Sequence, residues 1–353
     1  MKLVERISMK NNVLMPLVLI ALMPLTAAAQ SGANDVSKTG TTVAPFLEIP
    51  VGATAVGMGG AFVSLANDAT ALYWNAAGIA SFQQNQAVFV HTNWIADTRF
   101  DFAGVAVPLS GFGTLGLSFT SLSMADMIVR TVELPEGRGE YFSAGDIAMG
   151  ISYARQLTDR FAIGITTKYI QQTIWHESAS AFAVDVGTTF KTDLFGGMTI
   201  GASLSNFGSK MQLSGRDTRN FGRVDPTKLG SNDQIPSNLE MNSWDLPLLF
   251  QFGVSTNVLK SEEYRWTVAA DALNPSDDYQ SMNVGTEFSY RDYLYLRCGY
   301  QNLFLVQAEG GLSFGVGLSS NMLLGNASLM FNYGYRDFGR LTSIHTFSLG
   351  MSI

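Results

Sequence analysis

The sequence is poor in the side chains that catalysis and covalent cross-linking use. It has one cysteine, Cys298, which excludes an internal disulfide, and only three histidines. Charged residues make up 14% of the chain, far below the roughly 25% of typical soluble proteins. Beyond residue 30, no apolar run reaches the roughly 18 residues that a membrane-spanning helix needs. These shortages argue against a soluble enzyme, a disulfide scaffold and a helical membrane protein.

Glycine and aromatic residues are abundant instead. The chain contains 35 glycines, and Phe, Trp and Tyr together make up 11% of it. A bilayer admits only helices and closed barrels, because every backbone N–H and C=O must find a hydrogen-bond partner without water. Since the sequence offers no spanning helix, this composition favours β-strands in lipid.

The first 29 residues have the layout of a secretory signal. Three basic residues precede an apolar run over 13–25, and the small residues Ala27–Ala29 follow it. We expect cleavage near the last of these alanines, and therefore export. Three basic residues and one acid give this segment a net charge of +2, so a chain of net −7 leaves −9 after cleavage. An acidic chain without clustered Lys and Arg is a poor candidate for nucleic-acid binding.

From about residue 85, apolar and polar side chains alternate along the chain. Over 282–290, Met, Val, Thr, Phe and Tyr fall on one face, while Asn, Gly, Glu and Ser fall on the other. A period of two with one apolar face indicates a strand, and a polar face rich in Gly, Ser and Thr suits a crowded lumen. We predict fourteen strands, at 85–96, 98–109, 112–121, 144–156, 160–173, 180–192, 197–207, 246–257, 263–273, 280–290, 292–301, 306–319, 325–336 and 341–353.

The connections between these stretches are sided. Alternate connections are tight, at 110–111, 158–159, 193–196, 260–262 and 291. The two long polar connections, 122–143 and 208–245, both fall on the opposite side, where the extracellular loops of bacterial barrels lie. The sequence therefore predicts an all-β transmembrane antiparallel barrel of about fourteen strands over 85–353, located in the outer membrane.

Residues 30–84 lack this alternation. They begin with a small, polar linker and continue into an apolar segment rich in Gly and Ala, which suits short helices and turns. Asn67 or Asp68 is placed to cap a short helix through Thr70 to Trp74. A segment this apolar is best protected from water inside the barrel, so we expect a short helical hatch in the lumen; a small soluble cap is the alternative.

The same segment resembles a known family. The run VGATAVGMGGAFVSLANDATALYWNAAGIA is similar to the N-terminal signature of FadL-type outer-membrane proteins, and more closely to the PorV/PorQ family, some of whose members serve type IX secretion. DYLYLRCGYQ and FNYGYRDFGRLTSIHTFSLGMSI resemble that family's C-terminal half. The resemblance implies a fourteen-stranded barrel with an N-terminal hatch. Two positions depart from the pattern: Asn75-Ala76-Ala77-Gly78 replaces Asn-Pro-Ala-Gly, and the chain ends on Ile353 instead of an aromatic.

Motifs for catalysis or cofactor binding are weak. His91 and His345 fall in the first and last predicted strands, with Ser343 close by, but no nucleophile motif such as G-x-S-x-G occurs. The acidic turn Asp277–Asp278 lacks EF-hand spacing and is best explained as solvated. The glycines of 57–62 lack the spacing and lysine of a phosphate loop. We therefore predict no catalytic residues, no metal and no cofactor.

Charged residues on the predicted inward faces form a candidate lumen cluster. Glu287, Arg297 and Glu309 occur on three successive strands, and buried charges are costly unless they are paired. We therefore expect ion pairs that fill the lumen, and a structural role is favoured over substrate binding. Lys168, Asp185 and Asp271 are candidates to extend the cluster.

Three functions compete at this point. The first is an accessory of type IX secretion that binds or shuttles cargo at the cell surface, through the conserved C-terminal domain of the cargo. The second is a FadL-like channel for hydrophobic small molecules such as fatty acids, and the third is a barrel enzyme. The resemblance favours the first, with membrane lipid, secreted proteins and secretion components as the partners it implies.

Each of the first two functions has its own candidate residues. The hatch offers a ligand-lining set, which could equally be the core that docks the hatch to the wall: Phe46, Leu47, Ile49, Phe62, Leu72, Tyr73, Trp74 and Asn75. The loop 208–245 offers apolar residues to a protein partner: Phe221, Leu229, Ile235, Leu239 and Trp244, with Met211, Leu213 and Met241 beside them.

Overall fold

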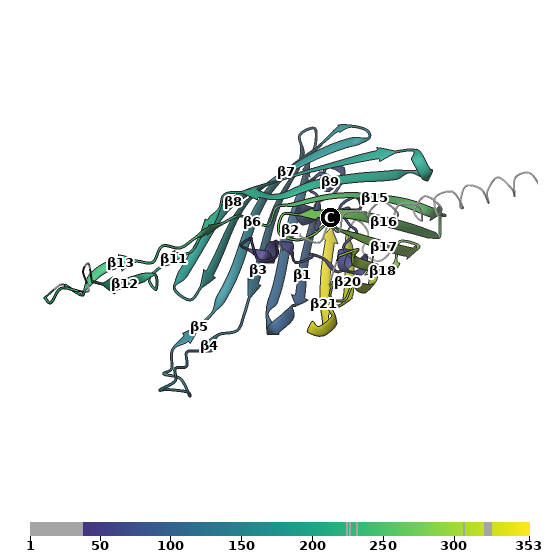
Figure 1. Cartoon of the computed structure of the whole chain (residues 1–353). Helices are drawn as coiled ribbons and strands as arrows, with labels where there is room; N and C mark the ends of the chain where they lie inside the picture. Colours follow the sequence, from purple (N-terminus) through teal and green to yellow (C-terminus); the bar gives the residue numbers. More distant parts are fainter. Residues whose placement is uncertain (1–37, 224, 226, 231, 306–307, 321–326) are drawn as a thin grey trace, which may run out of the picture. The chain divides into compact units, whose positions relative to one another are not determined.

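The computed structural model describes residues 38–353, except for 224, 226, 231, 306–307 and 321–326. The predicted signal at 1–29 lies outside the described residues and stays a prediction. Figure 1 traces the described chain, in which strands predominate. Among the described residues, no helix combines the length and the hydrophobicity that crossing a membrane would require.

The described residues contain a closed antiparallel barrel of fourteen long strands, because the main sheet has fifteen strands and β11 is a two-residue extension on β8. Each strand pairs with the strands before and after it in the chain, and β1 pairs with β21 to close the ring. The strands are β1 (Gln86–Asn93), β2 (Arg99–Leu109), β3 (Gly113–Ser123), β6 (Ala144–Thr158), β7 (Phe161–Ile174), β8 (Glu177–Thr192), β9 (Met198–Gly208), β15 (Leu249–Lys260), β16 (Tyr264–Pro275), β17 (Ser281–Tyr290), β18 (Leu294–Leu303), β19 (Leu312–Ser319), β20 (Ser328–Asp337) and β21 (Ser343–Ser352).

The predicted strand count is confirmed, and so is the alternation of faces. Phe288, Leu296 and Phe314 are exposed on the outside of the barrel, whereas Ser289 and Arg297 are buried toward the lumen. Lipid requires the apolar outer face, since a charged side chain there would lose its hydration without gaining a partner. The pairing of β1 with β21 places Asn93 opposite His345, so the first and last strands are neighbours as predicted.

Two short two-stranded arms leave the barrel at one end (Figure 1). β4 (Met127–Ile128) pairs with β5 (Tyr141–Phe142), and β12 (Arg219–Gly222) pairs with β13 (Ile235–Asn238). Both arms belong to the long connections, on the side opposite the tight turns. Near the second arm lie the two-residue strands β10 (Met211–Gln212), β11 (Ser214–Gly215) and β14 (Ser243–Trp244).

The segment before the barrel lies inside it, and we use the word hatch for residues 43–82. The hatch enters at the arm end, where the Val43 backbone N–H donates to the Asp245 carbonyl at 3.0 Å, and it is followed at the opposite end by Asn85, which bonds to Ile353 at 3.0 Å. Its helical turns are η3 (Pro45–Glu48), α2 (Ala53–Gly57), α3 (Ala71–Trp74) and η4 (Ala76–Ser81); outside it lie the turns η5 (Ile95–Asp97), η6 (Leu194–Gly196) and η7 (Gly339–Leu341).

The main hydrophobic core lies between the hatch and the barrel wall. Phe46, Phe62 and Leu72 of the hatch share one buried cluster with Val90 and Phe102 of the wall. Burying a side chain of this size stabilises the docked hatch by about 1.5–3 kcal/mol. The lumen of this barrel is therefore a packed interior over much of its height.

Candidate functional site

Glycines on the barrel wall allow the hatch backbone to approach closely. A Cβ on Gly299 would lie 2.2 Å from the backbone nitrogen of Gly59, and one on Gly285 would lie 2.1 Å from the carbonyl oxygen of Met58. Any larger residue at these wall positions would have to displace the hatch. The inward-facing glycines seen in the sequence are explained by this contact.

One carboxylate on the wall holds the middle of the hatch. Asp271 of β16 is fully buried, and its Oδ2 accepts the backbone N–H groups of Phe62 at 2.7 Å and Val63 at 2.9 Å. A buried N–H group left without an acceptor would cost about 1–3 kcal/mol, so this carboxyl stabilises the docked hatch. Asp271 was predicted to extend a cluster of ion pairs, and that prediction is wrong, because its partners are backbone N–H groups.

Asn75 fixes the turn that begins η4. Its side-chain nitrogen donates to the carbonyls of Val63 at 2.9 Å and Thr188 at 3.0 Å, while its side-chain oxygen accepts the backbone N–H of Ala77 at 3.1 Å. The side chain therefore joins two parts of the hatch to β8 and caps the turn. Asp68, one of the two predicted caps of the preceding helix, accepts the backbone N–H of Thr70 at 2.8 Å.

The predicted ligand-lining residues of the hatch are almost all buried. All of them are buried except Tyr73, which is half-buried. Two of the aromatic side chains also bond within the hatch: the Tyr73 hydroxyl donates to the Leu47 carbonyl at 2.9 Å, and the Trp74 indole N–H donates to the Val51 carbonyl at 2.8 Å. These contacts identify the hatch aromatics first as its own core.

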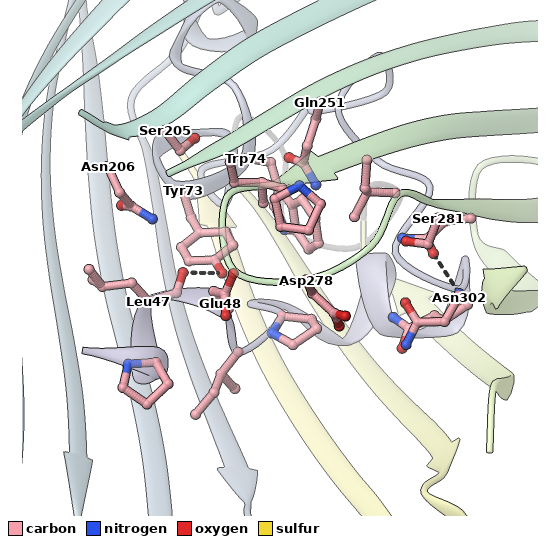
Figure 2. Close-up of a pocket in the computed structure, with 18 of the residues that line it drawn as sticks. Leu47, Glu48, Tyr73, Trp74, Ser205, Asn206, Gln251, Asp278, Ser281 and Asn302 are labelled. Carbon is pink, nitrogen blue, oxygen red and sulfur yellow. Dashed lines mark hydrogen bonds between the residues drawn. The ribbon is translucent and has the colours of Figure 1, made fainter. Parts of the chain in front are cut away.

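A cavity of about 300 Å³ lies in the lumen on the arm side of the hatch, and we call it the vestibule. Figure 2 shows Glu48, Tyr73 and Trp74 of the hatch across it from Gln251 and Asn302 of the wall and from Asp278, in the connection between β16 and β17. The lining mixes aromatic rings, prolines and leucines with amides and charged groups. Burial, reinforced by the charges of Asp277 and Asp278, raises the pKa of Glu48 to about 7.

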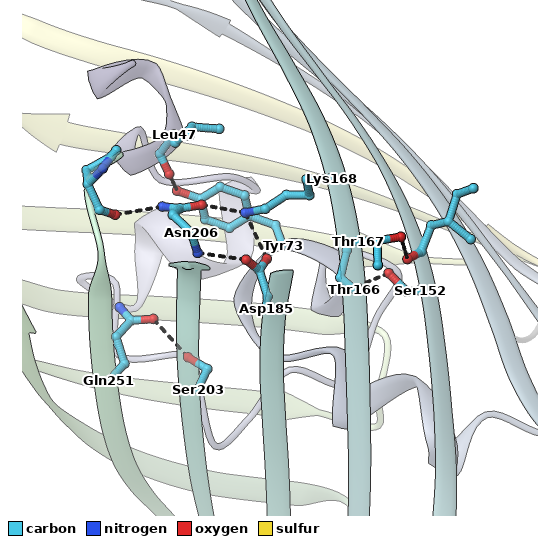
Figure 3. Close-up of polar contacts among 12 residues, drawn as sticks. Leu47, Tyr73, Ser152, Thr166, Thr167, Lys168, Asp185, Ser203, Asn206 and Gln251 are labelled. Atoms are coloured by element: carbon cyan, nitrogen blue, oxygen red, sulfur yellow. Dashed lines mark hydrogen bonds and ion pairs between the residues drawn. The ribbon is translucent and has the colours of Figure 1, made fainter. Parts of the chain in front are cut away.

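A polar network occupies the wall between β7, β8 and β9 (Figure 3). Lys168 Nζ lies 2.8 Å from Asp185 Oδ2 and donates to Asn206 Oδ1 at 2.5 Å. The backbone N–H of Asn206 donates to Asp185 at 2.7 Å, and its side chain donates to the Pro247 carbonyl at 2.9 Å. The pairing of β8 with β9 shifts register between Val184 and Val186, beside this network. The half-buried Lys168 cation is thus satisfied by one carboxylate and one amide.

A second ion-pair group lies on β16 to β18. Arg297 is 4% exposed; its Nε lies 2.7 Å from Glu287 Oε2, and its Nη1 donates to Asn332 at 2.9 Å. Arg265 adds a longer contact to Glu287 at 3.9 Å. Among the described residues, no ion pair joins this group to Lys168 and Asp185, so the predicted single cluster is two separate ones.

Glu309 does not join Arg297, and that part of the prediction is wrong. Glu309 is exposed and forms an ion pair with Arg340 at 3.3 Å. The physical reason is that β19 begins only at Leu312, since Gly310 and Gly311 have φ angles of 69° and 140°. These left-handed residues break the alternation that would have turned Glu309 inward.

Some residues of the long connection after β9 are buried in the core, and others are exposed on the surface. Met211 is 1% exposed and packs with the hatch core, as does half-buried Leu213. Ile235 and Met241 are half-buried. Of the predicted partner-binding residues, four are exposed: Phe221, Leu229, Leu239 and Trp244.

The two histidines near the closing strands have ordinary polar partners, whereas the acidic turn is only partly solvated, because half-buried Asp277 accepts the Thr42 hydroxyl and Asp278 lines the vestibule. His91 pairs with Asp101 at 2.7 Å, and His345 bonds to the Tyr333 hydroxyl at 2.8 Å and lies 3.3 Å from Ser343. Within the described ranges, no group of three or more His, Cys, Asp or Glu side chains is arranged to hold a metal ion.

The sequence matches the family described as Type IX secretion system protein PorV over residues 32–243, more than half of the chain. The chain belongs to the PorV family. This match covers the hatch, the first strands of the barrel and the arms. It confirms the resemblance carried by the hatch sequence, and it places this PorV-family protein among secretion proteins of the outer membrane.

Solved structures confirm the barrel type. The Pseudomonas putida toluene transporter TodX superimposes with a TM-score of 0.52 at 13% identity, covering 86% of this chain and 97% of that one. The Ralstonia pickettii toluene transporter TbuX gives 0.51 at 10% identity, with 86% and 97% coverage. A Pseudomonas aeruginosa FadL homologue gives 0.50 at 11% identity, with 86% and 98% coverage. At these identities the likeness extends to the fold alone. No curated protein sequence matches the chain.

One departure noted in the sequence does not prevent the turn from forming. Ala76 replaces the proline of the Asn-Pro-Ala-Gly pattern, and Asn75 caps the turn. The residues that sequence patterns missed are Asp271 as an anchor of the hatch and Arg336 as a lining residue of the vestibule. Arg336 shares the inward phase of its predicted strand with Asn332, and that alternation was the available signal.

Proposed function

We propose that this outer-membrane barrel binds secreted cargo through its outer arms, while the hatch keeps the lumen closed. The observation that carries the proposal is the exposure of large apolar side chains on the β12–β13 arm and the chain beside it. Leu229 is 105% exposed, and Phe221 and Leu239 are 66% and 58% exposed. Apolar side chains held away from any core favour association with a partner.

The shape of the arms supports the same function. Each arm is a two-stranded ribbon, so its outer edges leave backbone N–H and C=O groups available to an added strand. The β4–β5 arm carries its own exposed apolar residues, Met127 and Tyr141. Two such arms at one end of the barrel can contact one folded cargo domain together, and the cargo class that family membership suggests is a secreted protein with its conserved C-terminal domain.

The alternative, a channel for hydrophobic small molecules, has less support from the site. Phe62 and Leu72, two of its candidate ligand-lining residues, are packed between hatch and wall. Replacing them would disturb hatch docking before it disturbed any ligand.

The β12–β13 arm can be deleted without disturbing the residues from which it extends. The backbone N–H of Leu239 donates to the Thr218 carbonyl at 2.8 Å, so the two ends of a deletion of 219–238 already lie together. Met211 and β11 stay in place, because they pack on the barrel. We expect the deleted protein to assemble as a heat-modifiable barrel in the outer membrane and to lose co-purification with a cargo C-terminal domain.

A matched pair of variants tests whether cargo capture depends on the apolar side chains of the arm or only on its shape. In one, the exposed apolar residues Phe221, Leu229 and Leu239 become serine; in the other, the polar residues Asn220, Asn232 and Gln234 of the same arm become serine. The first should weaken cargo capture at least tenfold and the second should leave it within about twofold. Normal capture by the deletion, with hydrophobic uptake dependent on Phe62 or Trp74, would replace this proposal by the channel.

A further inference from the structure

The vestibule contains an arginine without a polar partner. Arg336, near the end of β20, is 8% exposed and lines the vestibule. No hydrogen bond or ion pair joins its side chain to another residue in the described part of the chain. Its contacts are aromatic instead: the guanidinium carbon lies 4.3 Å from the centre of the Phe338 ring and 5.7 Å from that of Trp94.

Two other cations of the lumen, Arg297 and Lys168, have polar partners. Arg297 has a carboxylate at 2.7 Å and an amide at 2.9 Å, and Lys168 has a carboxylate at 2.8 Å. A guanidinium carries five N–H donors and no acceptor. Aromatic faces stabilise its charge but offer its N–H groups no oxygen. Arg336 therefore presents to the vestibule N–H donors that no side chain in the described part of the chain accepts.

We infer that Arg336 anchors a binding site for a small organic carboxylate in the vestibule. The planar fork of a guanidinium matches the two oxygens of a carboxylate in a bidentate pair. Trp94, Phe338 and Leu305 offer apolar contact to the body of the ligand, and Gln301 and Asn302 offer amides. A cavity of about 300 Å³ is at the lower end of ligand-sized pockets, which range over roughly 300–1,000 Å³.

The charged groups that line the vestibule restrict the net charge of a ligand. Asp278 also lines it, and its charge would repel a ligand that carries several negative charges more strongly than a ligand that carries one. A single carboxylate on a compact, partly apolar body fits the lining better than a polyanion. A neutral hydrophobic molecule would leave the N–H groups of Arg336 without an acceptor.

This site goes beyond the proposed function, because it lies in the lumen and the cargo proposal concerns the arms. Loss of cargo capture on deleting the β12–β13 arm and loss of carboxylate binding on changing Arg336 are separate results. Either can fail without the other.

The test is a calorimetric titration of the purified full barrel in detergent with benzoate. Benzyl alcohol, which has the same ring without the charge, and inorganic phosphate are the comparison probes. The variants are Arg336→Gln, Arg336→Lys and Arg340→Gln. Arg340 is the matched control, because it lies four positions away and already pairs with Glu309. Heat-modifiable migration verifies that each variant is folded.

We expect saturable benzoate binding that weakens at least tenfold in Arg336→Gln, falls less in Arg336→Lys and stays unchanged in Arg340→Gln. Benzyl alcohol should bind at least tenfold more weakly than benzoate. Phosphate binding stronger than benzoate binding would overturn the assignment to an organic carboxylate. Absence of saturable benzoate binding to the unchanged protein, or equal binding by Arg336→Gln, would overturn the site itself, and equal binding of benzyl alcohol would reassign the vestibule to neutral ligands.

Discussion

Phe62 and Asp271 are 209 positions apart in the chain, and a hydrogen bond of 2.7 Å joins the backbone N–H of the first to the carboxylate of the second. With the bond to Val63, this contact ties the middle of the hatch to β16. Apolar packing, close backbone contact and further hydrogen bonds, such as those of Ala53 to Ser348 and of Asn75 to Thr188, also hold the hatch. The pair of hydrogen bonds at its centre sets its position along the lumen.

Replacing Asp271 by alanine should loosen the hatch. The change removes two hydrogen bonds and leaves two buried N–H groups without acceptors, at a cost of about 1–3 kcal/mol for each group. Larger and more frequent openings are expected in planar bilayers, with heat-modifiable barrel formation retained. Asp193→Ala, in an exposed turn paired with Arg160, is the control and should conduct like the unchanged protein. If Asp271→Ala also stays closed, the hatch is secured elsewhere.

Replacing Arg297 by methionine should destabilise the barrel itself. Glu287 would lose its closest cation and remain in the lumen, and breaking a buried pair costs about 3–5 kcal/mol. Adding Glu287→Gln should recover part of the loss. The midpoint of urea unfolding, read by gel mobility, measures the effect.

The exposed pair Glu309–Arg340 provides the contrast. Glu309→Gln should change stability by about 0–1 kcal/mol, because water already screens this pair. Equal losses of stability in Arg297→Met and Glu309→Gln would refute the claim that the Arg297–Glu287 pair stabilises the barrel more than the exposed pair does.

Docking of the hatch should depend on pH through Glu48. Its pKa is raised from 4.5 to about 7, so the docked hatch holds a proton that the released hatch gives up. The linked stability is therefore present below about pH 4.5 and is lost as pH rises toward 7. Because Glu48 is only partly buried, we expect an effect on the order of 1–2 kcal/mol.

Conductance at pH 5 and pH 8 measures this dependence. The unchanged protein should open more often at pH 8, and Glu48→Gln, which is always neutral, should show the low opening frequency at both values. An equally strong pH dependence in Glu48→Gln would assign the effect to another group.

The sequence predicted the strands well because a period of two is a local signal. Every predicted stretch overlaps one barrel strand, including 306–319, which overlaps β19 at Leu312–Ser319. Local pattern failed at the start of that strand, where Gly310 and Gly311 leave the extended region and Glu309 lies outside the lumen. Periodicity gives the face of a residue only where the strand is continuous.

Partners across the lumen could not be predicted in the same way. The sequence placed Asp271 on an inward face, but nothing in its spacing identifies two backbone N–H groups of the hatch as its partners. Lys168 and Asp185 face each other because β7 and β8 are adjacent, whereas Arg297 belongs to a distant strand of the ring. The alternation of side chains along a strand shows which residues point into the lumen. Which of these residues contact one another depends on the order of the strands around the closed barrel.

The glycines under the hatch give the last prediction. A Cβ on Gly299 would lie 2.2 Å from the Gly59 nitrogen, whereas a Cβ on Gly350 of β21 would meet its nearest atom at 3.8 Å. Gly299→Ala should therefore displace the hatch at an overpacking cost of about 1–3 kcal/mol, and Gly350→Ala should change stability by less than about 0.5 kcal/mol. Both variants add one methyl group to a barrel strand, so intrinsic strand preference is matched. Conductance should rise in Gly299→Ala alone, and both proteins should stay heat-modifiable. Equal behaviour of the two variants would mean that the hatch does not rest on this wall.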